Sequence, residues 1–339
     1  MPIATLVLAA LLMPASPATA STKTIRVGIA NQDTSMFDSP YFKPTKVKRT
    51  RYVVRWDAAR LPEELKRLDA FVNRARKSKV KVLLHISTNN FARRKGELPS
   101  RKKYKKYVGK LISRYYRKGV RDWGTWNEAN DSTQPTYNNP KRAADYFKDM
   151  YGMLDNKNRC GRRLTRKCNI VALDLLDGRT SKNHRSTARY VQRFYKRLSK
   201  TWDRRARTVG LHNYSDTNRK STRGTRSAIK AVKKYVKNPN IWLTETGGIV
   251  KLGKGFPCDP NNPASVKRAE RKADSAIAWM FRIANRYKRD IDRIYVYQWT
   301  GTSCLDERYD YGLVRADGSR RAGYYEVRNT IRKKKLFKP

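Results

Sequence analysis

Short apolar runs recur along the chain at regular intervals, and segments with a helical spacing of apolar positions separate them. In residues 24–30, for example, Ile25, Val27 and Ile29 alternate with other residue types, which is typical of a β-strand. Runs of this kind, rich in Val, Ile, Leu, Tyr and Trp and ending in loop-forming residues, predict eight strands. They cover residues 24–30, 51–56, 80–87, 120–126, 169–176, 208–214, 240–246 and 293–299.

Between most of these strands, apolar residues recur every three or four positions among charged ones, which predicts amphipathic helices. The clearest case is residues 62–77, and similar patterns occur at about 104–116, 140–154, 186–198, 225–236, 265–286 and 324–334. Pro140 suits the first turn of its helix. The segment after the first strand contains Pro40 and Pro44 and has little periodicity, so no long helix is expected there.

Regular alternation of strands and helices predicts an α/β fold in which helical crossovers join parallel strands. A doubly wound open sheet would show the same alternation. We favour a closed (β/α)8 TIM barrel because the strands number eight and because polar residues follow so many of them. The first strand is not followed by a glycine-rich phosphate loop, which argues against nucleotide binding. Because no change in composition marks a linker, a single barrel domain is expected over residues 21–339.

The first 20 residues are mostly Ala, Leu and Val and end in Ala18-Thr19-Ala20, the small-x-small pattern of a signal-peptidase site. They lack the basic residues that usually begin a signal peptide. The run is too short for a membrane anchor and is interrupted by Pro14 and Pro17. We therefore expect a signal peptide at 1–20, a mature chain starting near Ser21, and a secreted protein without a transmembrane anchor.

In an exported chain, four cysteines predict two disulfides, for which three pairings exist. Cys160 and Cys168 flank one basic segment, whereas Cys258 and Cys304 follow the seventh and eighth predicted strands, whose loops would be neighbours in a barrel. We expect Cys160 to pair with Cys168 and Cys258 with Cys304. A zinc site fits poorly, because the cysteine spacing differs from metal-binding motifs and only 3 histidines are present. No metal or other cofactor is expected.

The chain has 78 Lys and Arg against 28 Asp and Glu, a formal net charge of +50. A charge of this size attracts polyanions in a salt-dependent way, so adsorption to anionic cell-wall polymers is one expectation. A highly solvated surface is the plainer interpretation. The cations are spread over every predicted helix and no nucleic-acid-binding module accompanies them, so no specific nucleic-acid partner is expected. We expect a monomer.

Two glutamates, Glu128 in Trp126-Asn127-Glu128-Ala129 and Glu245 in Thr244-Glu245-Thr246-Gly247, each end a predicted strand. The carboxyl ends of barrel strands form the face where active sites lie. Strands four and seven lie opposite one another across such a barrel, so the two carboxyl groups could reach both sides of a sugar ring. A pair of carboxylates in this arrangement is the requirement for hydrolysis of a glycosidic bond.

These motifs resemble clan A of the glycoside hydrolases, the barrel group that includes the cellulase-type family five, over nearly all of the mature chain. The resemblance implies that Glu128, preceded by Asn127, is the acid/base and that Glu245 is the nucleophile. It also implies that Tyr214, in the motif His212-Asn213-Tyr214, hydrogen-bonds the nucleophile. In that group proline usually follows the Asn-Glu pair, whereas Ala129 stands here.

The same resemblance suggests further supporting residues at the ends of other strands. His85 matches a histidine of strand three, and Trp299 matches the strand-eight tryptophan on which a sugar rests. Trp126 is a second candidate for sugar stacking, because a pyranose offers an apolar face to an aromatic ring. For the arginine of strand two, the spacing favours Arg51, although Arg55 is nearer the end of its strand.

The resulting hypothesis is a secreted, retaining glycoside hydrolase that cleaves β-glycosidic bonds of a polysaccharide or oligosaccharide through a covalent glycosyl-enzyme. The alternative is a non-catalytic cell-wall or polysaccharide-binding barrel protein with a polybasic surface. A nucleic-acid-binding protein is a third interpretation, which rests on charge alone. The sequence does not specify the sugar, the linkage, or endo or exo action.

Overall fold

The computed structural model describes residues 23–93, 95–156, 158–164, 168–177, 186–305, 308–333 and 335–339. The predicted signal peptide at 1–20 and the predicted mature start at Ser21 lie outside these residues.

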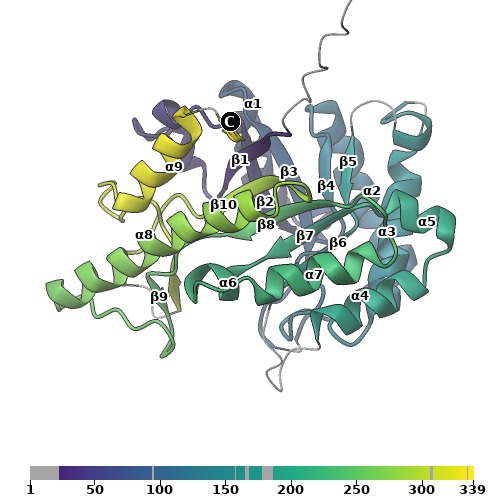
Figure 1. Ribbon diagram of the computed structural model, residues 1–339. Helices are drawn as coiled ribbons and strands as arrows, with labels where there is room; N and C mark the ends of the chain where they lie inside the picture. Colours follow the sequence, from purple (N-terminus) through teal and green to yellow (C-terminus); the bar gives the residue numbers. More distant parts are fainter. Residues whose placement is uncertain are drawn as a thin grey trace, which may run out of the picture.

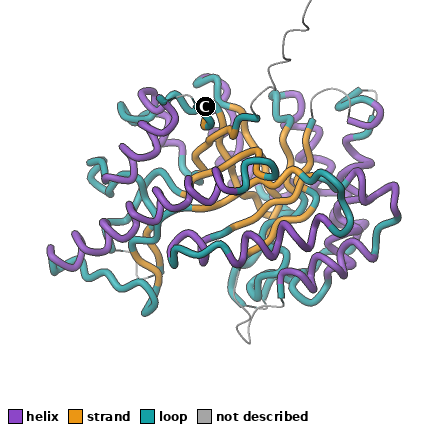
Figure 2. Tube along the Cα trace, viewed as in Figure 1, coloured by secondary structure: helices purple, strands orange, loops and turns teal. Residues whose placement is uncertain are grey.

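A ring of parallel strands forms the centre of the molecule, and helices surround it (Figures 1 and 2). The fifth position of the ring is divided between β5 and β6, which pair with β4 and β7 respectively and so close the barrel. The wall consists of β1 (Ile25–Ala30), β2 (Arg49–Arg55), β3 (Lys81–Ser87), β4 (Asp122–Gly124), β5 (Asn169–Val171), β6 (Leu173–Leu176), β7 (Thr208–His212), β8 (Asn240–Thr246) and β10 (Ile291–Tyr297). This topology confirms the predicted (β/α)8 barrel.

Helices fill the crossovers between the strands. They are α1 (Pro62–Lys77), α2 (Arg101–Arg117), α3 (Pro140–Leu154), α4 (Thr187–Lys196), α5 (Lys200–Arg205), α6 (Tyr214–Asn218), α7 (Arg223–Lys233), α8 (Pro263–Arg286) and α9 (Ala322–Arg332). Helix α1 shows why such segments are helical: proline stands at its start, acidic residues occupy its first turn and basic residues its last. In the described part of the chain, no helix combines the length and the apolar character needed to cross a membrane.

Several short elements were not expected from the sequence. The segment after β1 forms two 3-10 turns, η1 (Thr34–Phe37) and η2 (Lys43–Thr45), in agreement with the absence of a long helix there. Two more 3-10 turns are η3 (Ala58–Arg60) and η4 (Arg162–Leu164). A two-stranded antiparallel sheet joins β9 (Lys251–Leu252) to β11 (Tyr309–Asp310), and β12 (Phe337–Lys338) pairs with β1.

The strand ends also differ from the predicted ones, and two differences affect the site. Strand β7 stops at His212, so Tyr214 begins the short helix α6 instead of ending a strand. Strand β10 stops at Tyr297, two residues before the predicted end at Trp299. An aromatic residue stands two positions beyond each true end, so the alternation of side chains continues and periodicity alone placed these ends too late.

The side chains inside the barrel change along the barrel axis, from a closely packed layer to a charged and polar one. One layer holds Leu83, Trp242 and Tyr295, with the guanidinium of Arg293 3.7 Å above the Trp242 ring and 2.6 Å from Asp122. The main apolar core lies between the strands and the surrounding helices. At the carboxyl ends of the strands, the interior side chains are charged or polar, and these form the candidate site.

Candidate active site

Two donors, one from a strand and one from a helix, hold the Glu245 carboxylate near the end of β8. Nη1 of Arg51, in β2, lies 2.6 Å from Oε2, and the hydroxyl of Tyr214, at the start of α6, donates to Oε1 over 3.0 Å. Arg51 therefore takes the place predicted for the strand-two arginine. The alternative, Arg55, lies farther along β2 in the cavity wall and forms an ion pair with Asp57 at 2.6 Å.

Glu128 follows β4 and adopts a left-handed backbone conformation with φ of 45°. Such a φ is uncommon for a residue with a side chain. The backbone N–H of the next residue, Ala129, is bonded to the carbonyl oxygen of Asp174, which fixes this turn against β6. The Glu128 side chain is 21% exposed, and its Oε1 lies 2.8 Å from Nδ1 of His212. Glu128 therefore faces the cavity, while Oε1 of its carboxyl group contacts His212.

Oxygens of both glutamates lie near Nδ1 of His212. Nδ1 of His212 is 2.8 Å from Oε1 of Glu128 and 3.9 Å from Oε2 of Glu245. These two oxygens are therefore at most about 6.7 Å apart, the sum of the two distances, which is compatible with the roughly 5 to 5.5 Å of retaining glycosidases. The structure thus brings together the two glutamates that the sequence placed at opposite walls.

Arg51 connects Glu245 to two other predicted residues. Its Nη2 donates a short hydrogen bond to Oδ1 of Asn127, and its Nε donates to Nδ1 of His85 over 3.2 Å. His85 is fully buried and packs against Gly124, where a Cβ would lie 2.1 Å from the ring. Glycine at position 124 thus makes room for the imidazole that supports Arg51.

Asp174, in β6, is a buried residue of the site that sequence reasoning missed. It is fully buried; its Oδ2 lies 2.9 Å from Nε2 of His212 and 3.6 Å from the Arg51 guanidinium, while Thr244 donates a short hydrogen bond to Oδ1. Gly210 on the neighbouring strand is required here, because a Cβ at that position would lie 1.8 Å from Oδ1 of Asp174. A usable signal was present, since Asp174 is the one charged residue within the apolar run 170–176.

The buried charges shift the pKa values of the cluster. Burial disfavours the imidazolium of His212, but the carboxylates of Asp174, Glu245 and Glu128 outweigh it and raise its pKa to about 10. For Asp174, burial is outweighed by His212, His85 and Arg51, so its pKa is lowered. Asp174 and His212 therefore form a buried ion pair at neutral pH.

Burial favours the uncharged form of both Glu128 and His85. Burial raises the pKa of Glu128; the charge of Glu245 adds to this, and His212 opposes it. Burial lowers the pKa of His85 to about 3, with Arg51 adding to the effect and Asp174 opposing it. A glutamic acid with a raised pKa can donate a proton near neutral pH, whereas His85 stays a neutral hydrogen-bond partner of Arg51.

The predicted sugar-stacking roles of Trp126 and Trp299 are wrong. Trp299 is 1% exposed and contacts the rings of Phe42 and Tyr324 between the barrel and α9. Trp126 is also 1% exposed and stacks on Tyr146, whose ring centroid is 5.1 Å away. Trp126 packs against aromatic residues of α2 and α3, and Trp299 packs against Phe42 and α9, so neither indole reaches the cavity.

Tyrosines provide the aromatic walls of the site instead. The cavity above the two glutamates has a volume of about 900 Å³, and Tyr214, Tyr297, Tyr309 and Tyr311 line one side of it. The ring of Tyr311 lies 5.2 Å from that of Tyr214 and 5.7 Å from that of Tyr297. Tyr297, the last residue of β10, therefore lines the cavity at the strand end where Trp299 was expected.

Both expected disulfides are formed, Cys160 with Cys168 and Cys258 with Cys304. The second one links the segment after β9 to the segment after β10. Within the described ranges, no group of three or more His, Cys, Asp or Glu side chains is arranged to hold a metal ion. The acidic and imidazole groups of the site contact one another and Arg51, and carboxylates in such a setting can transfer protons or attack as nucleophiles.

Comparison with known proteins shows likeness at the level of fold. No protein-family model matches the chain, and no curated protein matches its sequence. Among solved structures, fungal β-1,4-galactanases match at 14% identity and a TM-score of 0.63, over 91% of this chain and 100% of theirs. A family 10 endoxylanase retrieved from a sugarcane soil metagenome matches at 15% identity and a TM-score of 0.58, over 91% of this chain and 96% of its own.

A family 39 glycoside hydrolase from Bacteroides cellulosilyticus also matches, at 14% identity and a TM-score of 0.54, over 91% of this chain and 63% of its own. At such identities the likeness establishes the barrel fold. The resemblance to family five has no counterpart among these three structures and stays a prediction.

Proposed function

We propose that this protein is a secreted, retaining glycoside hydrolase that cleaves β-glycosidic bonds of a polysaccharide or oligosaccharide. The observation that carries the proposal is the pair formed by Glu128 and Glu245, which line one cavity and both approach Nδ1 of His212. Galactanases and xylanases on the same barrel fold support it. The similar solved structures include members of families 10 and 39. These two families are therefore better supported than the cellulase-type family five.

In the first step, an oxygen of Glu245 attacks the anomeric carbon and the bond from that carbon to the leaving oxygen breaks. Glu128 gives its proton to the leaving oxygen, so the departing sugar leaves as an alcohol. Arg51 and Tyr214 each donate to Glu245 and hold its two oxygens in a fixed orientation for attack.

In the second step, water hydrolyses the glycosyl-enzyme. Glu128, now a carboxylate, takes a proton from the water as the water oxygen bonds to the anomeric carbon, and Glu245 is released. Displacement occurs twice at the same carbon, so the configuration is retained. His212 touches Glu128 throughout and carries a charge that stabilises the carboxylate form of Glu128 between the two steps.

The surroundings of the two glutamates decide which of them we assign as the nucleophile and which as the acid. Glu245 accepts hydrogen bonds from two donors, as an attacking carboxylate should, whereas burial raises the pKa of Glu128 as a proton donor requires. Asn127 lies beside both residues at the cavity wall and is placed to bind a sugar hydroxyl next to the reacting carbon.

A panel of aryl β-glycosides and β-linked polysaccharides tests the proposal, with the Glu245→Gln variant as the blank. Hydrolysis of at least one substrate by the wild-type protein, and none by the variant, is expected. Equal activity of the two proteins would reject the assignment. Binding of a glycan without any turnover would favour the non-catalytic alternative.

A further inference from the structure

A second cavity of about 850 Å³ lies against the catalytic one and is strongly basic. Its walls come from the end of α6, the loop after β8 and the first half of α8. Helix α8 extends outward beside the β9 segment (Figure 1), and the cavity that it lines is called the α8 groove below. Among the residues that the structure describes, its lining includes no carboxylate and five cations: Arg219, Lys220, Arg268, Arg271 and Lys272.

The groove continues directly from the catalytic cavity. Arg219, Ile249 and Phe256 line both of them. Ile249 is only four residues after Glu245, so their Cα atoms are separated by at most roughly 14 Å, the length of a fully extended chain. A glycan extending from the reacting sugar would therefore enter the groove within a few sugar units.

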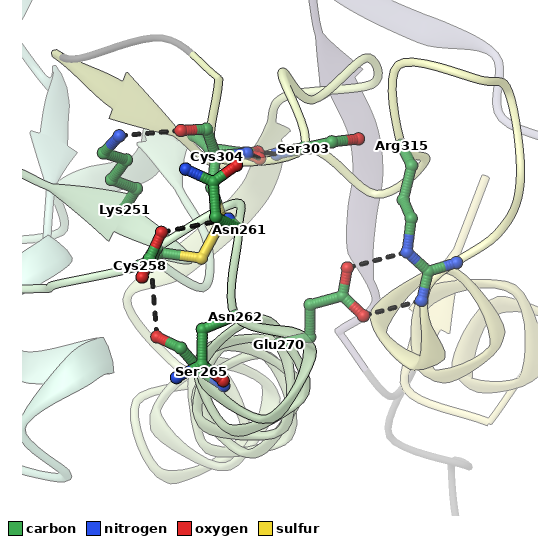
Figure 3. Close-up of a disulfide and its surroundings, with 12 residues drawn as sticks. Lys251, Cys258, Asn261, Asn262, Ser265, Glu270, Ser303, Cys304 and Arg315 are labelled. Carbon is green, nitrogen blue, oxygen red and sulfur yellow. Dashed lines mark hydrogen bonds and ion pairs between the residues drawn. A yellow bond between two sulfur atoms is a disulfide. The ribbon is translucent and has the colours of Figure 1, made fainter.

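The groove is rigidly joined to the catalytic strand. Asn218, at the end of α6, donates to the carbonyl oxygen of Gly247 and accepts from the N–H of Ile249, at 2.9 and 2.8 Å. The opposite wall is held by the disulfide between Cys258 and Cys304 (Figure 3). These links fix the distance between the cations and Glu245.

The cations of α8 have their charges available for a ligand. Arg268, Arg271 and Lys272 are three and four residues apart, so they share one side of the helix and repel one another. The acidic residue between them, Glu270, points the other way and pairs with Arg315 at 2.6 Å (Figure 3). Among the described residues, none of the five cations of the groove forms an ion pair with a carboxylate. Such a cluster is stabilised when an oxyanion lies between its members.

We propose that the α8 groove is a subsite for anionic groups on the glycan substrate, so that the polymer cut is acidic; this inference rests on the proposed function. Carboxylate and sulfate groups share the oxyanion chemistry that arginine recognises. A nucleic acid fits less well, because its charge on every backbone unit would place anions against Glu128 and Glu245 in the adjoining cavity. A glycan can carry its charge on the units that reach the groove and a neutral sugar at the site of cleavage.

The experiment compares two variants that remove equal charge. The test variant is Arg268→Gln/Arg271→Gln/Lys272→Gln. The control is Arg226→Gln/Lys230→Gln/Lys234→Gln, in a groove between α4 and α7 that also has five cations but shares no lining residue with the catalytic cavity. Binding is measured calorimetrically at several salt concentrations with oligosaccharides of hyaluronate, of chondroitin sulfate and of neutral β-1,4-xylan, and with a DNA oligonucleotide of matched charge.

The wild-type protein should bind at least one acidic oligosaccharide more tightly than the neutral one. The α8 variant should lose about tenfold in that affinity and show a weaker salt dependence, while the control changes less than twofold, because only the α8 cations face the bound chain. Both polymers carry glucuronate carboxylates and only chondroitin sulfate carries sulfate, so similar affinities identify carboxylate as the recognised group, and a preference for chondroitin sulfate identifies sulfate.

Equal losses in both variants would overturn the subsite, since they would indicate diffuse attraction by the net charge. Binding of DNA at least as tight as that of the acidic glycans, or a preference for the neutral oligosaccharide, would do the same. Hydrolysis of a small aryl glycoside needs only the catalytic cavity, so the α8 variant should keep it. Absence of any hydrolysis together with α8-specific binding would reject the glycosidase and leave the anion subsite standing.

Discussion

Nε2 of His212 lies 2.9 Å from Oδ2 of Asp174, and both side chains are fully buried. The other ring nitrogen of His212 contacts Glu128, so a fixed negative charge acts on the proposed general acid through one imidazole. Asp174 touches neither carboxylate oxygen of Glu128 in the described contacts and is therefore a positioning residue. Its effect should be visible in the pH dependence of the reaction.

Asp174→Asn should lower kcat and move the alkaline limb of the pH profile upward by about one unit. Without the aspartate charge, the pKa of His212 falls. A neutral His212 no longer opposes the raised pKa of Glu128, which then stays protonated to higher pH. Thr244→Val is the matched control, because it removes the hydroxyl that donates to Asp174 but leaves the charge. A profile that does not move in Asp174→Asn would contradict the proposed relation.

Glu128→Ala should reduce hydrolysis of substrates with poor leaving groups by about 10² to 10⁴-fold, the usual contribution of a general acid. Aryl glycosides with good leaving groups should be affected less, because their departing oxygen needs little protonation. Azide should restore turnover by entering the space of the missing carboxyl, and the glycosyl azide formed should keep the β configuration. A product of inverted configuration would point to a single displacement instead.

Tyr214→Phe should lower kcat about 10- to 100-fold with little change in KM, since it removes one of the two hydrogen bonds to Glu245. Steady-state kinetics on one aryl glycoside measure both quantities. Tyr311→Phe provides the comparison, because its ring lies in the same cavity but none of its hydrogen bonds in the described structure reaches Glu245. Equal effects of the two substitutions would show that the hydroxyl of Tyr214 has no special role.

The stability of the folded protein should fall as the pH rises from about 6.5 to about 10. The pKa of His212 is raised to about 10 from the 6.5 of an unfolded chain, so the native state binds the extra proton in this window. The stabilisation is complete below 6.5 and is lost as the pH passes the folded value. Urea unfolding at pH 6.5 and 9.5 measures the change, and His212→Gln should show a smaller difference between the two.

Trp299→Ala should destabilise the protein by about 3 to 5 kcal/mol, as expected for a large buried aromatic residue, whereas Trp299→Phe should leave KM unchanged. Tyr297→Ala should have the opposite pattern, with a raised KM and a small effect on stability. Thermal unfolding and kinetics on the same samples separate the two roles. A raised KM in Trp299→Phe would restore the sugar-stacking role to the tryptophan.

The sequence was sufficient to predict the barrel and the position of its two glutamates. Each strand carries its own local signal, and the ends of parallel strands must meet at one face, so Glu128 and Glu245 could be placed without knowledge of contacts. Arg51 and Tyr214 followed from the resemblance to clan A of the glycoside hydrolases. The expected disulfides agreed with the structure because each pairing joined segments that were already neighbours.

What sequence reasoning missed depends on side-chain direction near the strand ends. The sequence periodicity continues past the residue at which β10 ends. Trp299 was therefore expected in the cavity, and Tyr297 was overlooked. Asp174 was missed for another reason: an aspartate inside an apolar run is conspicuous, but its partners come from β2 and β7, which no local pattern connects. The α8 groove likewise combines three separate segments.

The close approach of Asp174 to Gly210 makes position 210 sensitive to substitution, although Gly210 lies outside the cleft lining. Asp174 occupies the room that any side chain at position 210 would need. A single methyl group introduced there should displace Asp174 and leave the imidazole of His212 uncharged. The variant should lose activity while the outer helices stay folded. In a library of random variants, a protein substituted at position 210 would therefore be well expressed but inactive.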